Sequence, residues 1–131
     1  HKMLCTRAKE ILELKSKSGL KLPEDEILSE LFLEAMLYVA SKCVPSELLR
    51  HANERSSERV YRNIENGNFI CYPDKPNFTD ENAHLMMDET LTYAVINEVI
   101  FLLNKDPFYR DLAIELISQY NANDGREKEW I

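Results

Sequence analysis

The three histidines, His1, His51 and His84, are the first residues to consider for metal chemistry. The clearest ligand-type spacing joins His84 to Asp88, four residues further on. A zinc site needs three or four nitrogen, sulfur or oxygen donors that converge. The sequence therefore predicts no metal site, and His84 is interpreted as a solvated histidine of a linker.

The three cysteines, Cys5, Cys43 and Cys71, are widely spaced and form no CxxC pair. This usage is typical of a reducing compartment and of inert thiols. A nucleophilic cysteine needs a neighbouring base and surroundings that stabilise its thiolate. Cys43 lies on the apolar arc of a predicted helix, and nothing near Cys71 in the sequence would activate it. We interpret these thiols as structural.

Glu98 is the most suggestive acid, because it interrupts a largely apolar stretch at residues 93–103. A carboxyl group in apolar surroundings is common at functional sites. The alternatives are an edge position that faces solvent or an ion pair with Arg50, Arg59 or Arg110. No Gly-rich phosphate loop, Walker pattern or nucleophile elbow is present. The sequence therefore predicts neither an enzyme nor a cofactor.

Size and charge place the chain in a broad class. Its 131 residues suit one domain with one core, predicted over residues 1–125 and followed by a tail at 126–131. The net charge of -7 argues against a nucleic-acid-binding domain, which normally carries a basic face. No apolar stretch is long enough to span a bilayer. We expect a soluble protein of intracellular origin that binds no membrane.

Hydrophobic periodicity and capping residues predict a mainly α fold: a small bundle of four to five helices with one inserted β-hairpin. The predicted helices cover residues 6–19, 22–43, 45–57, 87–105 and 106–125. The second is apolar around most of its circumference, so it is either central or shared with another subunit, and the fourth is apolar nearly all round, as a buried helix is. Leu33 and Leu37 lie at the margin of the second helix's apolar arc and are candidate interface residues.

The stretch RVYRNIENGNFICYP, residues 59–73, predicts the hairpin. Asn66 and Gly67 tolerate the positive φ angles of a type I′ turn. An isolated hairpin is marginal in water, so it must pack on this chain's helices or on a neighbour. Its outer edge can also accept a strand from another chain. The candidate interface residues of this arm are Tyr61, Arg62, Ile64, Asn66, Gly67, Phe69 and Tyr72.

The tail carries two apolar residues, Trp130 and Ile131, which are unusual in water and are candidates for a second docking element. Together with the wide apolar arcs of the helices, they suggest more apolar surface than one small domain buries. Large exposed apolar patches mark interfaces. The alternative is a well-filled monomeric bundle.

The order of these elements resembles that of the small helical head–tail connector (adaptor) proteins of tailed bacteriophages. The resemblance covers residues 24–123 and rests on ERVYRNIENGNFICYPDKP followed by the helix pair MDETLTYAVINEVIFLLNKDPFYRDLAIELISQYNAND. Tyr61-Arg62, Asn66-Gly67 and the KDPFY stretch at residues 105–109 carry most of it. The N-terminal third departs from the pattern, which leaves the place of the first helix open.

The resemblance implies a structural virion protein that is assembled in the cytoplasm of the host bacterium. Copies would form a homo-oligomeric ring below the portal protein, extend the DNA channel and offer a docking surface to a tail-side completion protein. DNA would pass through without specific binding, and the hairpin would reach the portal or a neighbouring subunit. Two alternatives remain: a small helical regulatory or scaffolding protein that acts as a homodimer, and an enzyme accessory or hydrolase built around Glu98.

Overall fold

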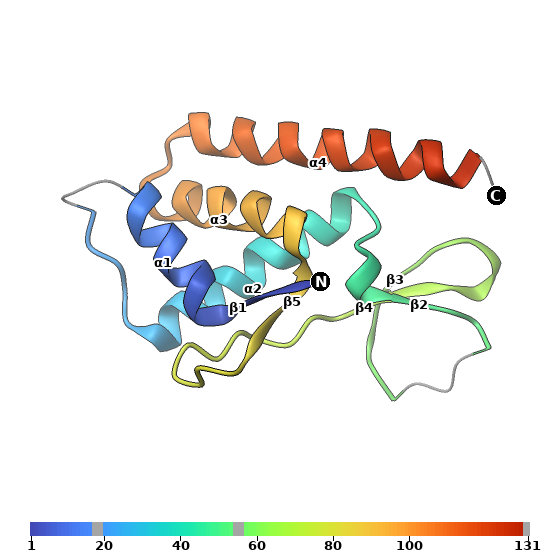
Figure 1. The fold of residues 1–131 in the computed structure, drawn as a ribbon, viewed down its shortest axis with the longest axis horizontal. Coiled ribbons are helices and arrows are strands. Elements are labelled where there is room, and N and C mark those ends of the chain that lie inside the picture. The colour runs from blue at the N-terminus through green and yellow to red at the C-terminus, as the bar shows by residue number, and fades with distance from the viewer. Residues whose placement is uncertain (17–19, 54–56, 130–131) are drawn as a thin grey trace.

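The computed structural model describes residues 1–16, 20–53 and 57–129, with residues 124–129 as backbone alone. It confirms the mainly α class with a small bundle and a hairpin. The helices of the described chain are α1 (Cys5–Lys15), α2 (Asp25–Lys42), α3 (Glu89–Asn104) and α4 (Pro107–Glu129). In Figure 1, α4 lies across the top of the molecule, with α3 directly below it.

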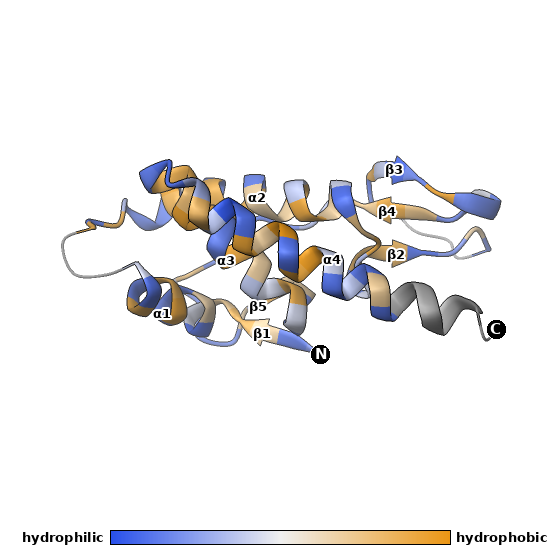
Figure 2. Cartoon of the chain, turned by 90° about the horizontal axis from the view of Figure 1, so that it is seen from above, coloured by the Kyte–Doolittle hydropathy of each residue, from blue (hydrophilic) through white to orange (hydrophobic). Residues whose placement is uncertain are grey.

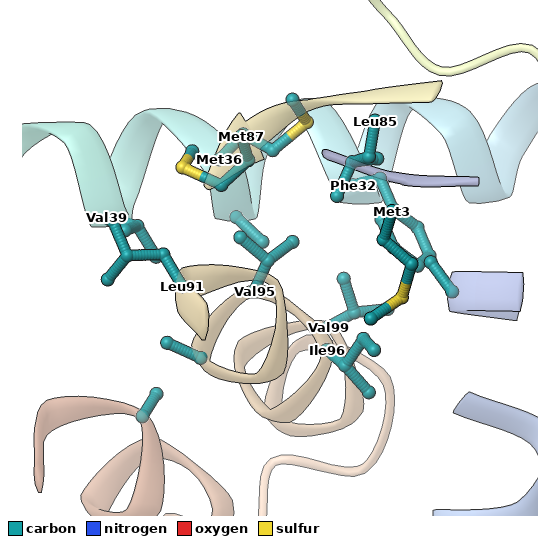
Figure 3. Close-up of a cluster of buried hydrophobic side chains, with 14 of the residues drawn as sticks. Met3, Phe32, Met36, Val39, Leu85, Met87, Leu91, Val95, Ile96 and Val99 are labelled. Carbon is teal, nitrogen blue, oxygen red and sulfur yellow. The ribbon is translucent and has the colours of Figure 1, made fainter. Parts of the chain in front are cut away.

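Helix α3 is the centre of the bundle and contacts each of the other three helices. Its residues 94–100 are all buried, and this run includes Asn97 and Glu98. The sequence predicts this position because a helix that is apolar nearly all round can only be stable when it is covered on every side. Figure 3 shows side chains of α2 and of neighbouring strands, among them Met36 and Met87, converging on Leu91 and Val95 of α3.

Two small sheets accompany the helices. Strand β1 (Lys2–Leu4) pairs antiparallel with β5 (His84–Asp88), and a second sheet has the order β2–β4–β3. Its strands are β2 (Leu49–Arg50), β3 (Val60–Asn63) and β4 (Phe69–Cys71). Seen from above in Figure 2, this three-stranded sheet lies at one end of the molecule. The β1–β5 pair was not predicted, because each strand is short and depends on the other.

The helix predicted at residues 45–57 is wrong. The chain makes a single 3₁₀ turn, η1 (Ser46–Leu48), and then enters β2, whose Leu49 and Arg50 pair with β4. Among the described residues of this segment after Pro45, only Leu48 is fully buried, so a helix here would have little apolar surface to bury. Pairing with the hairpin instead satisfies the backbone groups of β2, and tertiary context overrides local propensity.

The predicted turn is confirmed. Asn66 has φ 61° and Gly67 has φ 78°, and the Asn68 amide donates to the carbonyl oxygen of Glu65 at 3.1 Å. Both positive angles belong to a type I′ turn, which matches the twist of the two strands. A Cβ atom on Gly67 would also lie 3.0 Å from the Cβ of Ala52, so a side chain there would require Ala52 to move by a few tenths of an ångström.

Helix α4 begins as predicted, because the Asp106 carboxylate accepts a hydrogen bond from the Phe108 amide at 3.0 Å and Pro107 is its first residue. Its predicted end at residues 123–125 is wrong, since the helix continues to Glu129. The boundary between domain and tail predicted at residue 125 therefore falls inside this helix. A glycine costs a helix only about 1 kcal/mol and does not by itself end it. Trp130 and Ile131 lie outside the described residues.

Candidate functional site

The hairpin is fixed to the last turns of α2. Arg62 Nε donates to the carbonyl oxygen of Ala40 at 2.8 Å, and its Nη2 donates to that of Cys43 at 2.5 Å. The Tyr61 hydroxyl donates to the carbonyl oxygen of Leu37 at 3.1 Å. The last carbonyls of a helix have no partner within it and favour a nearby cation. Arg62 meets both needs, so the hairpin belongs to the body of the domain.

Aromatic contacts hold the base of the hairpin as well. The rings of Tyr61 and Tyr72 meet edge to face, with 5.1 Å between their centres, and the Arg59 guanidinium lies 3.9 Å from the centre of the Tyr72 ring. Ile64 and Phe69 are partly buried against the core. Of the seven hairpin residues predicted to form an interface, five are thus half-buried by this chain itself, and Asn66 and Gly67 are exposed at the tip.

A cavity of about 680 Å³ opens between the hairpin turn and β2. Its walls combine apolar and amide side chains with one guanidinium, one imidazole and one carboxylate. The lining residues are Val44, Leu49, His51, Arg62, Asn63, Ile64, Glu65, Asn66 and Asn68. Sequence reasoning did not predict this cavity, because residues 49–50, which form β2, were expected to be helical.

Strand β3 is an edge strand of the three-stranded sheet, and within the described chain it pairs with β4 alone. Val60, its first residue, is 43% exposed. An edge strand held firmly by its neighbours is a template for strand pairing with another chain. Val60 therefore joins the candidate interface residues, although sequence reasoning had not selected it.

Leu33 and Leu37, the candidate residues at the margin of the α2 arc, are both half-buried. The carbonyl oxygen of Leu37 accepts a hydrogen bond from the Tyr61 hydroxyl, so the hairpin covers this part of α2. Ile27, which follows Asp25 and Glu26 in the first turn of α2, is the most exposed large apolar residue of that helix, at 55%. Most of the apolar surface of α2 is buried by other parts of the same chain.

Glu98 forms the ion pair that was one of the alternatives for it. Its side chain is 2% exposed, and Arg110 of α4 donates to both carboxylate oxygens, from Nε at 3.1 Å and from Nη2. The Arg110 guanidinium also lies 4.5 Å from the centre of the Tyr38 ring and 4.5 Å from that of the Phe101 ring. Both oxygens of Glu98 thus accept hydrogen bonds, and the ion pair joins α3 to α4.

The thiols are enclosed. Cys5, Cys43 and Cys71 are each less than 5% exposed, and burial raises the pKa of the Cys71 thiol to about 11. Burial also raises the pKa of the Cys5 thiol. Across residues 1–16, 20–53 and 57–123, no group of three or more His, Cys, Asp or Glu side chains is placed to hold a metal ion. No helix in the described part of the chain is long and apolar enough to cross a membrane.

Asp88 sits at a junction that the sequence did not indicate. Its carboxylate accepts hydrogen bonds from the amides of Ser46 at 3.0 Å and Glu47 at 2.8 Å, and from the Tyr120 hydroxyl at 2.8 Å. Asp88 is the N-cap residue of α3, but its side chain makes no capping hydrogen bond to that helix and caps the 3₁₀ turn η1 instead. Burial raises the pKa of the Tyr120 hydroxyl well above its usual value. This junction ties η1, α3 and α4 together.

A slot follows the groove between α3 and α4 on the side of α1. A cavity of about 370 Å³ is lined by Asn97 and Tyr93 of α3, by Leu112, Glu115, Leu116 and Gln119 of α4, and by Lys15 of α1. A second cavity of about 510 Å³ shares the walls formed by Tyr93, Leu116 and Gln119 and extends to Asp88 and Tyr120. We call these two adjoining cavities the α3–α4 slot. No residue of the three-stranded sheet lines it.

Comparison with protein-family models, with curated proteins and with solved structures finds no match to this chain.

Proposed function

We propose that this chain is a structural subunit of a tailed-phage particle, a head–tail connector that assembles into a ring below the portal. The observation that carries the proposal is the firm attachment of an edge strand. Arg62 and Tyr61 fix β3 to α2 through the carbonyl oxygens of Ala40, Cys43 and Leu37, and Val60 is exposed on that strand. A rigid edge can align a neighbouring subunit without the entropy cost of ordering a loose arm.

The state of the reactive groups supports a structural role rather than catalysis. The two oxygens of Glu98 are taken by Arg110, and the thiols of Cys5 and Cys71 have raised pKa values because they are buried. A nucleophile or a general base needs an accessible and activated group. The resemblance to connector proteins then gives the kind of assembly, and the acidic net charge of -7 suits a channel wall that lets DNA slide.

The test is quantitative mass spectrometry of gradient-purified tailed particles from the source culture. We expect the chain at a low, ring-like ratio to the capsid protein. Its absence from otherwise complete particles would contradict the proposal and favour the homodimeric regulatory protein.

A pair of variants tests the edge of β3. Val60→Lys places a charge on the exposed edge strand, a common means of blocking strand pairing, and we expect it to lower incorporation into particles. Ile27→Lys makes the same change at an apolar residue of α2 that is similarly exposed, 55% against 43%, and serves as the matched control. Thermal unfolding of both variants should match the wild type. Equal incorporation of the two would show that the β3 edge makes no contact in the particle.

A further inference from the structure

Asn66 and Gly67, at the tip of the hairpin, form the one Asn-Gly pair of the sequence. Both residues are exposed, so water reaches them. In such a pair the backbone nitrogen of glycine can attack the side-chain amide carbon of asparagine, because no Cβ atom shields that nitrogen. Asparagine is among the residues that limit proteins at high temperature. The pair is therefore a candidate modification site, and its conformation decides whether it reacts.

The reaction changes the chain in two balanced steps. A bond forms between Gly67 N and Asn66 Cγ, the bond from Cγ to Nδ2 breaks, and Nδ2 leaves as ammonia with the proton of Gly67 N. The product is a five-membered succinimide ring. Water then adds to one of the two carbonyl carbons of the ring and opens it. Residue 66 becomes an aspartate or an isoaspartate, and either product carries one more negative charge.

The type I′ turn holds the reacting atoms apart. Asn66 has φ 61° and ψ 31°. In an L-residue the Cβ atom lies about 120° beyond the backbone nitrogen around the Cα–C bond, so this ψ places Gly67 N about 150° from Cβ. Ring closure needs these two atoms nearly eclipsed, with the reacting atoms about 3–3.5 Å apart. No staggered χ1 angle brings Cγ that close to Gly67 N at this ψ, so the closed turn blocks the attack.

Three hydrogen bonds hold the turn in this conformation. The Asn68 amide donates to the carbonyl oxygen of Glu65 at 3.1 Å, and the Ile64 amide donates to that of Asn68 at 2.9 Å. The Asn68 side-chain oxygen accepts from the Ala52 amide at 2.9 Å, which ties the turn to the chain after β2. Rotation about ψ of Asn66 swings Asn68 away from these partners. Local opening of the turn must therefore precede the reaction.

The modification would change the turn itself. An isoaspartate adds one carbon atom to the backbone of a two-residue turn, and the length of the turn fixes the register of a hairpin. The new carboxylate also lies next to the exposed Glu65 in a chain whose net charge is already -7. We therefore expect the isoaspartate form not to close again in the same register.

We propose that Asn66 is a deamidation site controlled by the hairpin: the closed type I′ turn protects it, and opening of the turn lets it react irreversibly. The sequence alone marks the pair as reactive, whereas the backbone angles make the reaction depend on the turn. The proposal does not depend on the connector function, because the reaction needs water and no partner protein.

The test follows deamidation of residue 66 by peptide-mapping mass spectrometry in a slightly alkaline buffer. The full chain is incubated folded, and a second sample is incubated unfolded in guanidinium chloride. We expect the unfolded chain to deamidate at least about tenfold faster, because the reaction in the folded chain is limited to the fraction of molecules with an open turn. Equal rates in the two samples would overturn the proposal, and so would an unreactive residue 66 in the unfolded chain.

Variants separate control by the turn from the reactivity of the pair. Asn68→Ala removes the acceptor of the Ala52 amide and leaves the Asn66-Gly67 pair intact. We expect this variant to deamidate several-fold faster than the wild type when folded and at the wild-type rate when unfolded. Asn82→Ala, at an exposed asparagine outside the hairpin, should leave the rate at residue 66 unchanged.

Equal rates in the two folded variants would contradict control by the turn. The comparison of folded and unfolded wild type decides the proposal even if Asn68→Ala does not fold.

Discussion

Arg62 Nε lies 2.8 Å from the carbonyl oxygen of Ala40, and this hydrogen bond joins the edge strand of the sheet to the last turn of α2. The same guanidinium reaches the carbonyl of Cys43. One side chain therefore caps a helix and positions a hairpin. This relationship makes the hairpin a rigid part of the domain, whereas the sequence suggested a projecting arm.

Arg62→Met keeps the aliphatic stem and removes the donors. Because the carbonyls of Ala40 and Cys43 lose a charged partner, we expect the free energy of unfolding to fall by about 1–3 kcal/mol in urea denaturation. Amide hydrogen exchange in β4 should become faster at the same time. Arg7→Met, at an exposed arginine of α1, should stay within about 0.5 kcal/mol of the wild type. An equal loss of unfolding free energy in Arg62→Met and Arg7→Met would show that the hydrogen bonds of Arg62 do not stabilise the fold.

The two halves of the buried ion pair should respond differently to truncation. Arg110→Met leaves the Glu98 carboxylate, 2% exposed, without a cation, and we expect a loss of about 3–5 kcal/mol. Glu98→Gln leaves Arg110, which is 36% exposed and can be hydrated, so the loss should be about 1–2 kcal/mol. Urea denaturation near neutral pH measures both. A larger loss for Glu98→Gln than for Arg110→Met would show that water stabilises the unpaired carboxylate better than the unpaired guanidinium.

Alkaline pH should destabilise the fold through the buried thiol. Burial raises the pKa of Cys71 from 9.0 to about 11, so between these values the native state keeps a proton that the unfolded chain has lost. The contribution is therefore complete below about pH 9 and is lost as the pH rises towards about 11. The raised pKa of Tyr120 acts in the same direction. In a pH series of urea midpoints, Cys71→Ala should show a shallower alkaline decline. A slope identical to that of the wild type would contradict the assignment.

Tyr120→Phe tests the junction around Asp88. The substitution removes the hydroxyl that donates to the Asp88 carboxylate at 2.8 Å, and we expect a loss of about 1–2 kcal/mol in the free energy of unfolding. Tyr93→Phe, at a tyrosine that is 42% exposed, is the control and should have little effect on stability. If the two variants were equally stable, the junction would contribute nothing beyond burial of the ring.

The sequence by itself determined the elements whose signals are local. The capping pair Asp106-Pro107 predicted the start of α4, and Asn66-Gly67 predicted the turn, because caps and turns depend on backbone angles of a few adjacent residues. The apolar circumference of α3 predicted its central place. The resemblance to connector proteins added a function that stays a proposal.

Only the tertiary structure decided which distant residues meet. Strand β2 forms because β4 lies beside it, Arg110 among three candidate arginines reaches Glu98, and the Asp88 carboxylate caps a turn more than forty residues earlier. It also left Asn97 Oδ1 buried without a hydrogen-bond donor among the described residues. Pairing, ion pairs and unpaired acceptors depend on the relative positions of packed elements, and a periodic pattern records only which face of each element is buried.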